Sequence, residues 1–110
     1  MKDYKVDKES FSESFRKEVY EVVSQIPVGK VSTYGGIALL LGAPQCSRMV
    51  GRALKEVPDE LSIPCHRLVN SAGRLVPGWV EQKQLLLAEE VSFKANGCVN
   101  LKEHLWHVDE

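Results

Sequence analysis

The chain has 110 residues, of which 44% are hydrophobic and 26% charged, and these proportions are typical of one globular domain rather than of two domains or a disordered tail. The longest uninterrupted apolar run, from Ile37 to Leu41, is far shorter than the roughly 18 to 20 residues that cross a bilayer, so a membrane-spanning helix is excluded. No apolar stretch follows the charged start of the chain, and we therefore expect a cytoplasmic protein with neither a secretory signal nor a membrane partner.

Three cysteines, Cys46, Cys65 and Cys98, cannot all pair within one chain, and none forms a C-x-x-C motif. We therefore expect free thiols rather than a disulfide framework or a four-cysteine zinc site. His104 and His107 have a spacing that could place two imidazoles on one helical face, but no third ligand is evident except at the chain end. The sequence thus predicts no metal site and no cofactor.

The charge is unevenly distributed along the chain, although the formal net charge of -1 argues against indiscriminate binding to nucleic acid. Between Pro27 and Pro77 there are six Lys or Arg residues and three Asp or Glu residues, so this middle segment carries +3 and the two flanks together carry -4. A basic segment between acidic flanks indicates a localised anionic partner, with an ordinary solvated surface as the alternative.

We expect residues 1–10 to form a loose N-terminal arm and an amphipathic helix to follow over about residues 11–25. Ser10 and Glu13 match the S-x-x-E capping pattern at its start, and Pro27-Val28-Gly29 ends it. Hydrophobic side chains recur through this segment at helical spacing. They are Phe11, Phe15, Val19, Val22, Val23 and Ile26.

The basic middle segment predicts a helix-turn-helix. Its first helix starts after Thr33, whose hydroxyl can cap the free amides, and runs to Gly42, which is a left-handed stop. Pro44 suits the first turn of the next helix, which carries Arg48, Arg52 and Lys55 on its outer face. The opposite face forms a buried stripe of Cys46, Met49, Val50, Ala53 and Leu54.

Pattern alone does not separate a binding helix-turn-helix from an ordinary pair of helices whose polar face is solvated. Gly51 favours the binding interpretation, because it lies in mid-helix on the basic face. Glycine costs roughly 1 kcal/mol relative to alanine at such a position, and close approach of another backbone is one physical reason to keep it.

Pro58 ends the helix that carries the basic face, and residues 61–69 are expected to be extended or irregular. A turn follows over residues 70–73, and a further helix over about residues 80–90, buried through Leu85, Leu86 and Leu87.

Residues 91–101 read as a small hairpin with Asn96-Gly97 at its turn, after which Leu105 and Trp106 fold back onto the core. The predicted fold class is therefore mainly α with minor β, in a small single domain that contains a winged-helix-like helix-turn-helix.

Cys65 and His66 stand between Pro64 and Arg67 in the basic segment. A cysteine is a useful nucleophile only as a thiolate, which needs a nearby proton acceptor or positive charge, and His66 and Arg67 could supply both. Adjacent side chains of an extended segment point to opposite faces, so His66 would reach the sulfur only through a kinked backbone or a bridging water. Taken alone, the pair also fits a buried inert cysteine beside a surface histidine.

The stretch Ile63-Pro64-Cys65-His66-Arg67-Leu68-Val69 resembles the IPCHRVV active-site motif of the O6-alkylguanine-DNA alkyltransferases. Val31-Ser32-Thr33-Tyr34-Gly35, together with Ser47-Arg48, resembles the helix-turn-helix that precedes that motif. The resemblance covers about residues 11–91, and it is free of gaps from Tyr34 to Gly73. It implies that residues 11–110 form one DNA-binding and active-site domain, monomeric and without a cofactor, whose partner is double-stranded DNA containing O6-alkylguanine.

In this family the cysteine takes the alkyl group from guanine O6 in one irreversible displacement. The resemblance therefore implies that Cys65 is the alkyl acceptor, His66 its base, Glu90 the carboxylate that orients His66, and Tyr34 a hydrogen-bond donor to the departing guanine.

The resemblance also implies that the damaged nucleotide is flipped out of the duplex through the minor groove. Arg48 would be the finger that replaces the flipped base, because its planar cation can fill the gap while pairing with the backbone. Gly51 would let the helix come close to the DNA. The remaining DNA-binding candidates are Thr33, Ser47, Arg52, Lys55 and Arg67.

Two departures from the family pattern bear on function. Val57 stands where the family has a hinge asparagine, and residues 74–80 lack the Tyr-Ser lid residues, with only Gly78 corresponding. With its short length and its Leu105-Trp106 tail, the chain is in these respects more similar to the alkyltransferase-like proteins. Those proteins bind alkylated guanine and hand it to nucleotide excision repair without removing the alkyl group.

Alkyltransferase-like proteins typically have tryptophan or alanine at the nucleophile position, whereas this chain has Cys65. The leading hypothesis is therefore a DNA repair protein that transfers the alkyl group to Cys65. The first alternative is a non-catalytic lesion sensor with nucleotide excision repair proteins as partners. The second is a plain helix-turn-helix DNA-binding regulator.

Overall fold

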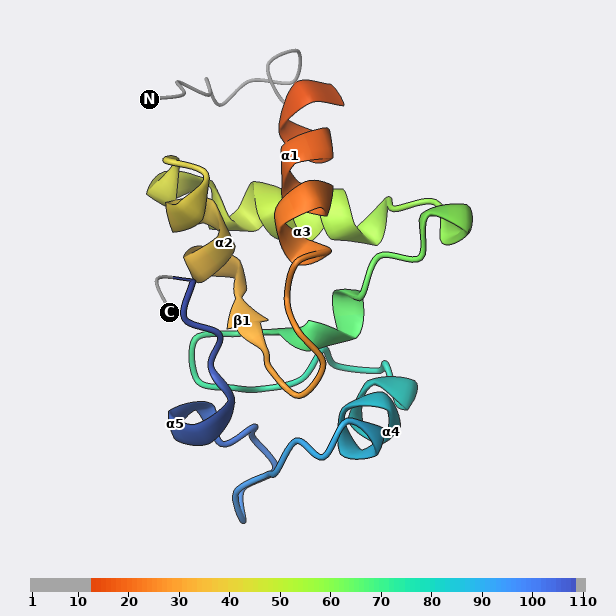
Figure 1. Cartoon of the computed structure of the whole chain (residues 1–110), viewed down its shortest axis with the longest axis vertical. Coiled ribbons are helices and arrows are strands. Elements are labelled where there is room, and N and C mark those ends of the chain that lie inside the picture. The colour runs from red at the N-terminus through yellow and green to blue at the C-terminus, as the bar shows by residue number, and fades with distance from the viewer. Residues whose placement is uncertain (1–12, 109–110) are drawn as a thin grey trace. The chain divides into compact units, whose positions relative to one another are not determined.

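The computed structural model describes residues 13–108, so Ser10, Phe11 and the predicted N-terminal arm lie outside the described residues. The predicted class, mainly α with minor β, is confirmed (Figure 1). None of the helices in the described range is both long and apolar enough to cross a membrane. With η for a 3-10 helix, the elements are α1 (Glu13–Val23), β1 (Ser32–Thr33), α2 (Tyr34–Leu40), η1 (Pro44–Cys46), α3 (Ser47–Lys55), η2 (Asp59–Leu61), η3 (Cys65–Arg67), β2 (Leu68–Val69), α4 (Glu81–Ala88) and α5 (Leu101–His104).

The described chain divides into two compact units. The first comprises residues 13–25 and 34–65, and the second comprises residues 26–33 and 66–108. The division therefore passes between Cys65 and His66, which are neighbours in the chain.

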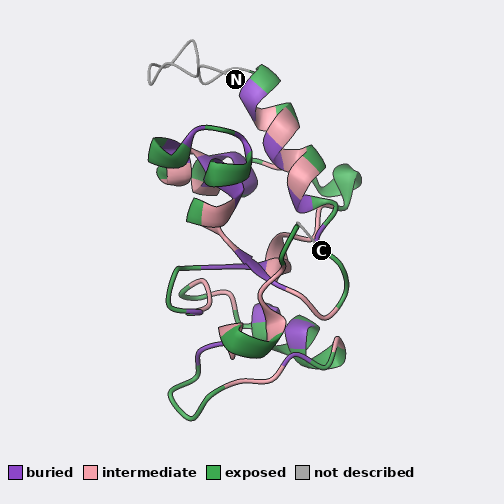
Figure 2. Ribbon diagram, turned by 60° about the vertical axis from the view of Figure 1, so that its left-hand side comes forward, coloured by how far each residue is buried: buried purple, intermediate pink, exposed green. Residues whose placement is uncertain are grey.

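The first unit is built on α1, α2 and α3. The buried side chains of α1, Phe15, Val19 and Val23, recur every four residues along one face, as the predicted helix requires (Figure 2). Gly42 follows α2 with a φ of 76°, so the predicted left-handed stop is confirmed. The predicted stripe of α3 is buried at all positions except Met49, which is half-buried.

The second unit is built around a two-stranded parallel sheet, in which Ser32 of β1 pairs with Leu68 of β2 and Thr33 with Val69. Its core is a cluster of apolar side chains. They come from the residue before β1, from β2, from α4 and from the segment that follows α4. The cluster consists of Val31, Val69, Leu86, Val91 and Val99.

Helix α4 confirms the predicted element but not the whole of its predicted buried face. Leu86 is fully buried, whereas Leu85 and Leu87 are 42% and 51% exposed. The buried partner of Leu86 on this helix is instead Gln82, which is 0% exposed. Gln82 and Leu86 are one turn apart and share a face, so the leucines on either side of Leu86 turn outward.

The C-terminal segment follows the predicted path in two of its three parts. Phe93 and Val99 form an antiparallel bridge around the turn at Gly97, and the backbone N–H of Trp106 donates to Val31 O over 2.8 Å. Leu101, however, starts α5 rather than continuing the hairpin.

His104 has a structural place within the second unit. Its Nδ1 lies 3.0 Å from Gly29 O, and its Nε2 accepts the backbone N–H of Ser92 over 3.0 Å. Because both ring nitrogens have partners within the fold, this histidine joins the loop before β1 to the C-terminal segment.

Candidate functional site

Cys65 is the first residue of η3, and its backbone N–H donates to Ile63 O over 2.8 Å. The chain is therefore tightly turned at the cysteine rather than extended, which removes the assumption that neighbouring side chains point to opposite faces. Cys65 is half-buried, whereas Cys46 and Cys98 are only 1% and 7% exposed. All three cysteines of the chain lie within the described residues, and Cys65 is the most exposed of them.

The surroundings of Cys65 in the first unit favour its protonated form. Burial raises the pKa of the Cys65 thiol above its ordinary value. A thiol in this state carries less thiolate at neutral pH than a free cysteine, so it needs a base to become a nucleophile.

Tyr34, the first residue of α2, also keeps its proton. Burial raises the pKa of Tyr34, and the negative charge that Cys65 carries as a thiolate raises it further. The phenol is therefore available as a hydrogen-bond donor at neutral pH.

The ring of Tyr34 lies beside α3 at Gly51, where an added β-carbon would be 3.8 Å from Tyr34 Cδ1. That distance is an ordinary van der Waals contact, and the φ of Gly51 is not in the left-handed region. The fold of this unit would therefore accept an alanine at this position.

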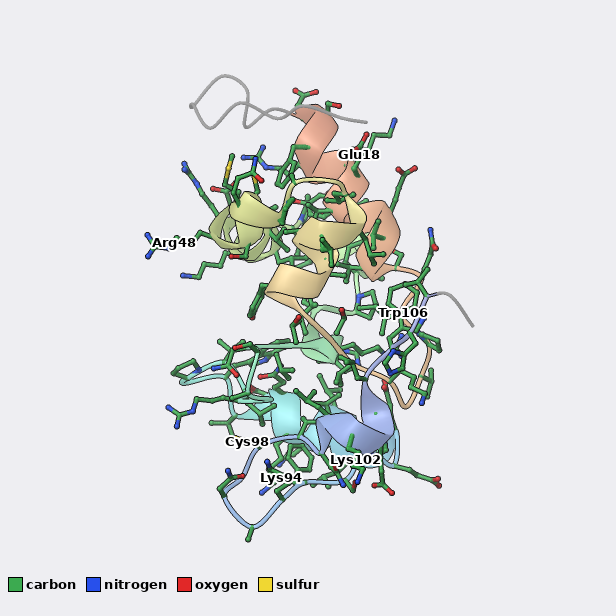
Figure 3. The ribbon with its side chains drawn as sticks, turned by 90° about the vertical axis from the view of Figure 1, so that its left-hand side faces the viewer. Glu18, Arg48, Lys94, Cys98, Lys102 and Trp106 are labelled. Carbon is green, nitrogen blue, oxygen red and sulfur yellow. The ribbon has the colours of Figure 1, made fainter. Side chains whose placement is uncertain are left out.

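The outer face of α3 is basic, as the sequence predicts. Arg48, Arg52 and Lys55 are exposed, and Figure 3 shows Arg48 pointing away from the ribbon. Near the C-terminal end of the helix, Glu56 lies 3.8 Å from Arg52 and 2.6 Å from Arg16 of α1. The carboxylate thus reduces the net positive charge at one end of this face.

The two remaining DNA-binding candidates of the helix-turn-helix lie at element boundaries. Ser47 is the half-buried first residue of α3, and Thr33 is the last residue of β1.

In the second unit, His66 belongs to a cluster centred on Glu89, the residue directly after α4. His66 Nε2 lies 2.8 Å from Glu89 Oε2. If Nε2 carries the ring proton and donates it to the carboxylate, the lone pair of the neutral ring is on Nδ1. The cluster therefore fixes which ring nitrogen can act as a base.

Arg67 binds the same carboxylate through two nitrogens. Its Nε lies 3.0 Å from Glu89 Oε1, its Nη2 lies 2.8 Å from Glu89 Oε2, and its Nη1 donates to Ile26 O over 2.8 Å. The side chain of Arg67 is only 14% exposed. The guanidinium is therefore bound by groups of the protein itself. Arg67 has a structural role, in place of the contact with DNA that the sequence predicts.

Glu89 is strongly held in its ionised form. Burial alone raises the pKa of Glu89, but hydrogen bonds from Arg67, His66 and the backbone of Gly29 outweigh it and lower the pKa from 4.5 to about 2. The Gly29 N–H donates to Oε1 over 3.2 Å. Glu89 is thus a carboxylate throughout the pH range in which a histidine titrates.

The prediction that Glu90 orients His66 is wrong by one residue, since Glu89 occupies that place. Counting from the buried Leu86, positions three and four residues later both return to the buried side of a helix, so helical spacing does not separate Glu89 from Glu90. The backbone does separate them: α4 ends at Ala88, and Glu90 has a φ of 66° that turns its side chain to an exposed position.

The two departures from the family pattern lie in different units. Val57 is half-buried after α3 in the first unit, and the loop of residues 74–80 that lacks the lid residues precedes α4 in the second. Gly78, the residue of this loop that does correspond to the family, is exposed with a φ of 82°. An added β-carbon on Gly78 would meet nothing within 4 Å, so only its backbone conformation calls for glycine.

Comparison with known proteins gives one consistent family. Residues 14–92 match the model of the 6-O-methylguanine DNA methyltransferase DNA binding domain. The chain is 39% identical over 106 residues to the DNA base-flipping protein of Escherichia coli strain K12, a match that covers 94% of this chain and 80% of that protein. It is 38% identical over 78 residues to the methylated-DNA–protein-cysteine methyltransferase of Mycolicibacterium paratuberculosis, covering 69% of this chain and 47% of that protein.

Solved structures show the same two kinds of relative. The crystal structure of Atl1 from Schizosaccharomyces pombe in complex with damaged DNA containing O6-carboxymethylguanine matches with a TM-score of 0.77 and 37% identity, over 87% of this chain and 97% of that chain. The crystal structure of OGT from Mycobacterium tuberculosis in complex with DNA matches with a TM-score of 0.65 and 32% identity, over 72% of this chain and 51% of that chain.

Proposed function

Because the chain belongs to the 6-O-methylguanine DNA methyltransferase family, we propose that it is a DNA repair protein that binds duplex DNA containing O6-alkylguanine, flips the damaged nucleotide and transfers its alkyl group to Cys65. The observation that carries the transfer step is Cys65 itself, a half-buried cysteine in the Pro-Cys-His-Arg motif of a family in which the cysteine is the alkyl acceptor.

Helix α3 is the proposed DNA-binding element. Its exposed Arg48, Arg52 and Lys55 supply the positive charge that phosphate binding needs. Gly51 on the same helix is not required by packing or by backbone conformation, since an added β-carbon would make only an ordinary contact. Close approach of a nucleic-acid backbone accounts for the glycine, and this supports a docked α3 rather than a merely solvated one.

Arg48 is proposed as the residue that fills the space left by the flipped nucleotide. It lies in the first turn of α3 and is exposed, so its guanidinium can enter the duplex while the helix rests on the backbone. Extrusion costs a few kcal/mol, and least for a damaged base, so a finger that stabilises the extruded state favours lesions.

In the proposed transfer step, His66 takes the proton from the Cys65 thiol, directly or through water. The sulfur attacks the alkyl carbon, the new S–C bond forms, and the C–O6 bond breaks. The electron pair of the broken bond goes to guanine O6, where the Tyr34 phenol donates a hydrogen bond to the developing negative charge. His66 becomes an imidazolium, which the carboxylate of Glu89 stabilises. Glu89 thus has the role of the carboxylate that orients the base in a catalytic triad.

Mass spectrometry tests this step. Incubation with a duplex containing O6-methylguanine should make the peptide that carries Cys65 heavier by one CH2 group, and the peptides with Cys46 and Cys98 should be unchanged. Cys65→Ser should abolish the mass gain and retain lesion binding, whereas Cys98→Ser should behave as wild type in both assays. An unmodified Cys65 after tight lesion binding would refute transfer.

The second candidate function is that of a lesion sensor that binds O6-alkylguanine without transferring the alkyl group. The structural match favours it: the Atl1 structure matches with a TM-score of 0.77 over 87% of this chain, whereas the OGT structure matches with a TM-score of 0.65 over 72% of this chain. The same experiment separates the two functions. Equal affinity for damaged and undamaged duplexes, with preference for one base sequence, would instead indicate a helix-turn-helix regulator.

A further inference from the structure

Gln82 is the one fully buried polar side chain on α4, and its amide uses three hydrogen bonds within the second unit. Its Nε2 donates to Leu68 O over 2.9 Å and to His66 O over 3.2 Å, and its Oε1 accepts the backbone N–H of Val76 over 2.7 Å. A buried amide is costly unless its groups are paired, so this arrangement is sharply defined in geometry.

These bonds connect three segments that are separate in the chain. One is α4, the second is the backbone from His66 into β2, and the third is the loop at Val76. Glu89, seven residues after Gln82, holds the imidazole of the same histidine. The region of α4 therefore holds His66 at two points, the ring through Glu89 and the main chain through Gln82.

We propose that Gln82 is a positioning residue for the repair reaction, which fixes the main chain that carries His66 and couples it to the loop containing Val76. This role rests on the proposed function of His66 as the base. If only the ring of His66 were held, the side chain could still move with a shift of its backbone. Because both the ring and the backbone carbonyl are hydrogen-bonded, the imidazole is restricted to one position. Loss of the amide should therefore change the rate of transfer more than lesion binding.

Two variants divide the roles of the amide, and a third is their control. Gln82→Met keeps the length of the side chain but removes every hydrogen bond. Gln82→Glu keeps an oxygen that can accept from Val76 N–H, but it removes the donors to His66 O and Leu68 O. Gln84→Met makes the same exchange as the first variant at an exposed position of α4, and it is the matched control.

Single-turnover transfer from a saturating duplex containing O6-methylguanine gives two readouts. Its amplitude reports the fraction of folded protein, and its rate constant reports the geometry of the site. We expect both Gln82 variants to lower the rate constant by about tenfold or more, with lesion affinity within about twofold of wild type and Gln84→Met unchanged. A loss of amplitude with an unchanged rate constant would overturn the proposal, because that is the signature of a purely structural role.

Nuclear magnetic resonance of the free protein tests the same inference independently of transfer. In Gln82→Met, the Val76 amide should lose its protection from hydrogen exchange and the ring resonances of His66 should shift or broaden, and neither should happen in Gln84→Met. Unchanged His66 resonances in Gln82→Met would overturn the proposal. If wild-type protein transfers no alkyl group, the proposed transfer fails, and these spectra still decide whether Gln82 positions His66.

Discussion

Replacing Glu89 by glutamine tests the cluster on which the proposed base depends. The amide has the shape of the carboxyl group but no charge, so it leaves the guanidinium of Arg67, whose side chain is only 14% exposed, without its counter-charge. A pKa lowered from 4.5 to about 2 corresponds to about 3 kcal/mol of stabilisation at neutral pH. We therefore expect Glu89→Gln to lower the free energy of unfolding by about 2 to 4 kcal/mol at pH 7.

The pH dependence of that loss identifies its cause. Because the pKa of Glu89 is lower in the folded protein, its stabilisation is fully present above the ordinary value of 4.5 and disappears as the pH falls toward about 2. Urea unfolding of both proteins at a series of pH values should therefore show a difference that is constant near neutrality and shrinks below about pH 4.5.

Glu90→Gln is the matched control, since it makes the same chemical change one residue later at an exposed side chain. It should change the free energy of unfolding by less than about 0.5 kcal/mol at every pH. The same contrast should appear in the rate of alkyl transfer, which Glu89→Gln slows and Glu90→Gln leaves unchanged. Equal losses in the two variants, or a Glu89→Gln deficit as large at pH 3 as at pH 7, would refute the reasoning.

Three further substitutions probe the DNA-binding face and the core, and a fourth, Gly78→Ala, is the comparison for the last of them. Arg48→Ala should lower the preference for a duplex with O6-methylguanine more than it lowers affinity for undamaged duplex, as measured by competition; equal losses would contradict its role as the finger. Glu56→Gln should raise affinity for undamaged duplex and steepen the slope of log affinity against log salt by about 1, because the carboxylate lies 3.8 Å from Arg52; an unchanged slope would mean that this end of α3 does not face phosphates. Gly73→Ala should lower the free energy of unfolding by more than about 2 kcal/mol, because its φ is 87° and the new β-carbon would lie 2.7 Å from a backbone oxygen. Gly78→Ala, with a φ of 82° in open space, should cost about 1 kcal/mol, and equal urea midpoints for the two variants would show that the close contact is irrelevant.

The sequence predicts the helices well where a periodic apolar face meets a strong terminal signal. The buried side chains of α1 recur every four residues between residues 13 and 23. Gly42 adopts the left-handed backbone conformation, which most other residues adopt only at an energetic cost. The basic face of α3 was predictable for the same reason, because an exposed helical face needs nothing from the rest of the fold to define it. These features are local, and local rules suffice for them.

The Glu89 cluster depends on contacts that sequence spacing does not determine. Arg67 reads as one more positive charge in a basic segment, and only the folded chain shows that its guanidinium is bound by a carboxylate 22 residues away. Gln82 reads as an exposed polar residue between two charged ones, and the three backbone groups that pair with its amide lie 6, 14 and 16 residues away in the chain. Buried polar residues escape hydrophobic patterning because their partners, not their own polarity, decide where they lie.

Binding and alkyl transfer place different demands on the same residues, and this separates the two candidate functions. A basic α3 face and an arginine finger serve a sensor and a transferase equally, because both must extrude the nucleotide. The thiol of Cys65 differs: burial raises its pKa, so the sulfur is a poor nucleophile until a base removes its proton. A sensor has no use for that base, whereas a transferase depends on His66, on the carboxylate that binds its ring and on the amide that binds its backbone. Substitutions at Glu89 and Gln82 that slow methylation of Cys65 but leave lesion affinity intact would therefore mark this chain as a transferase.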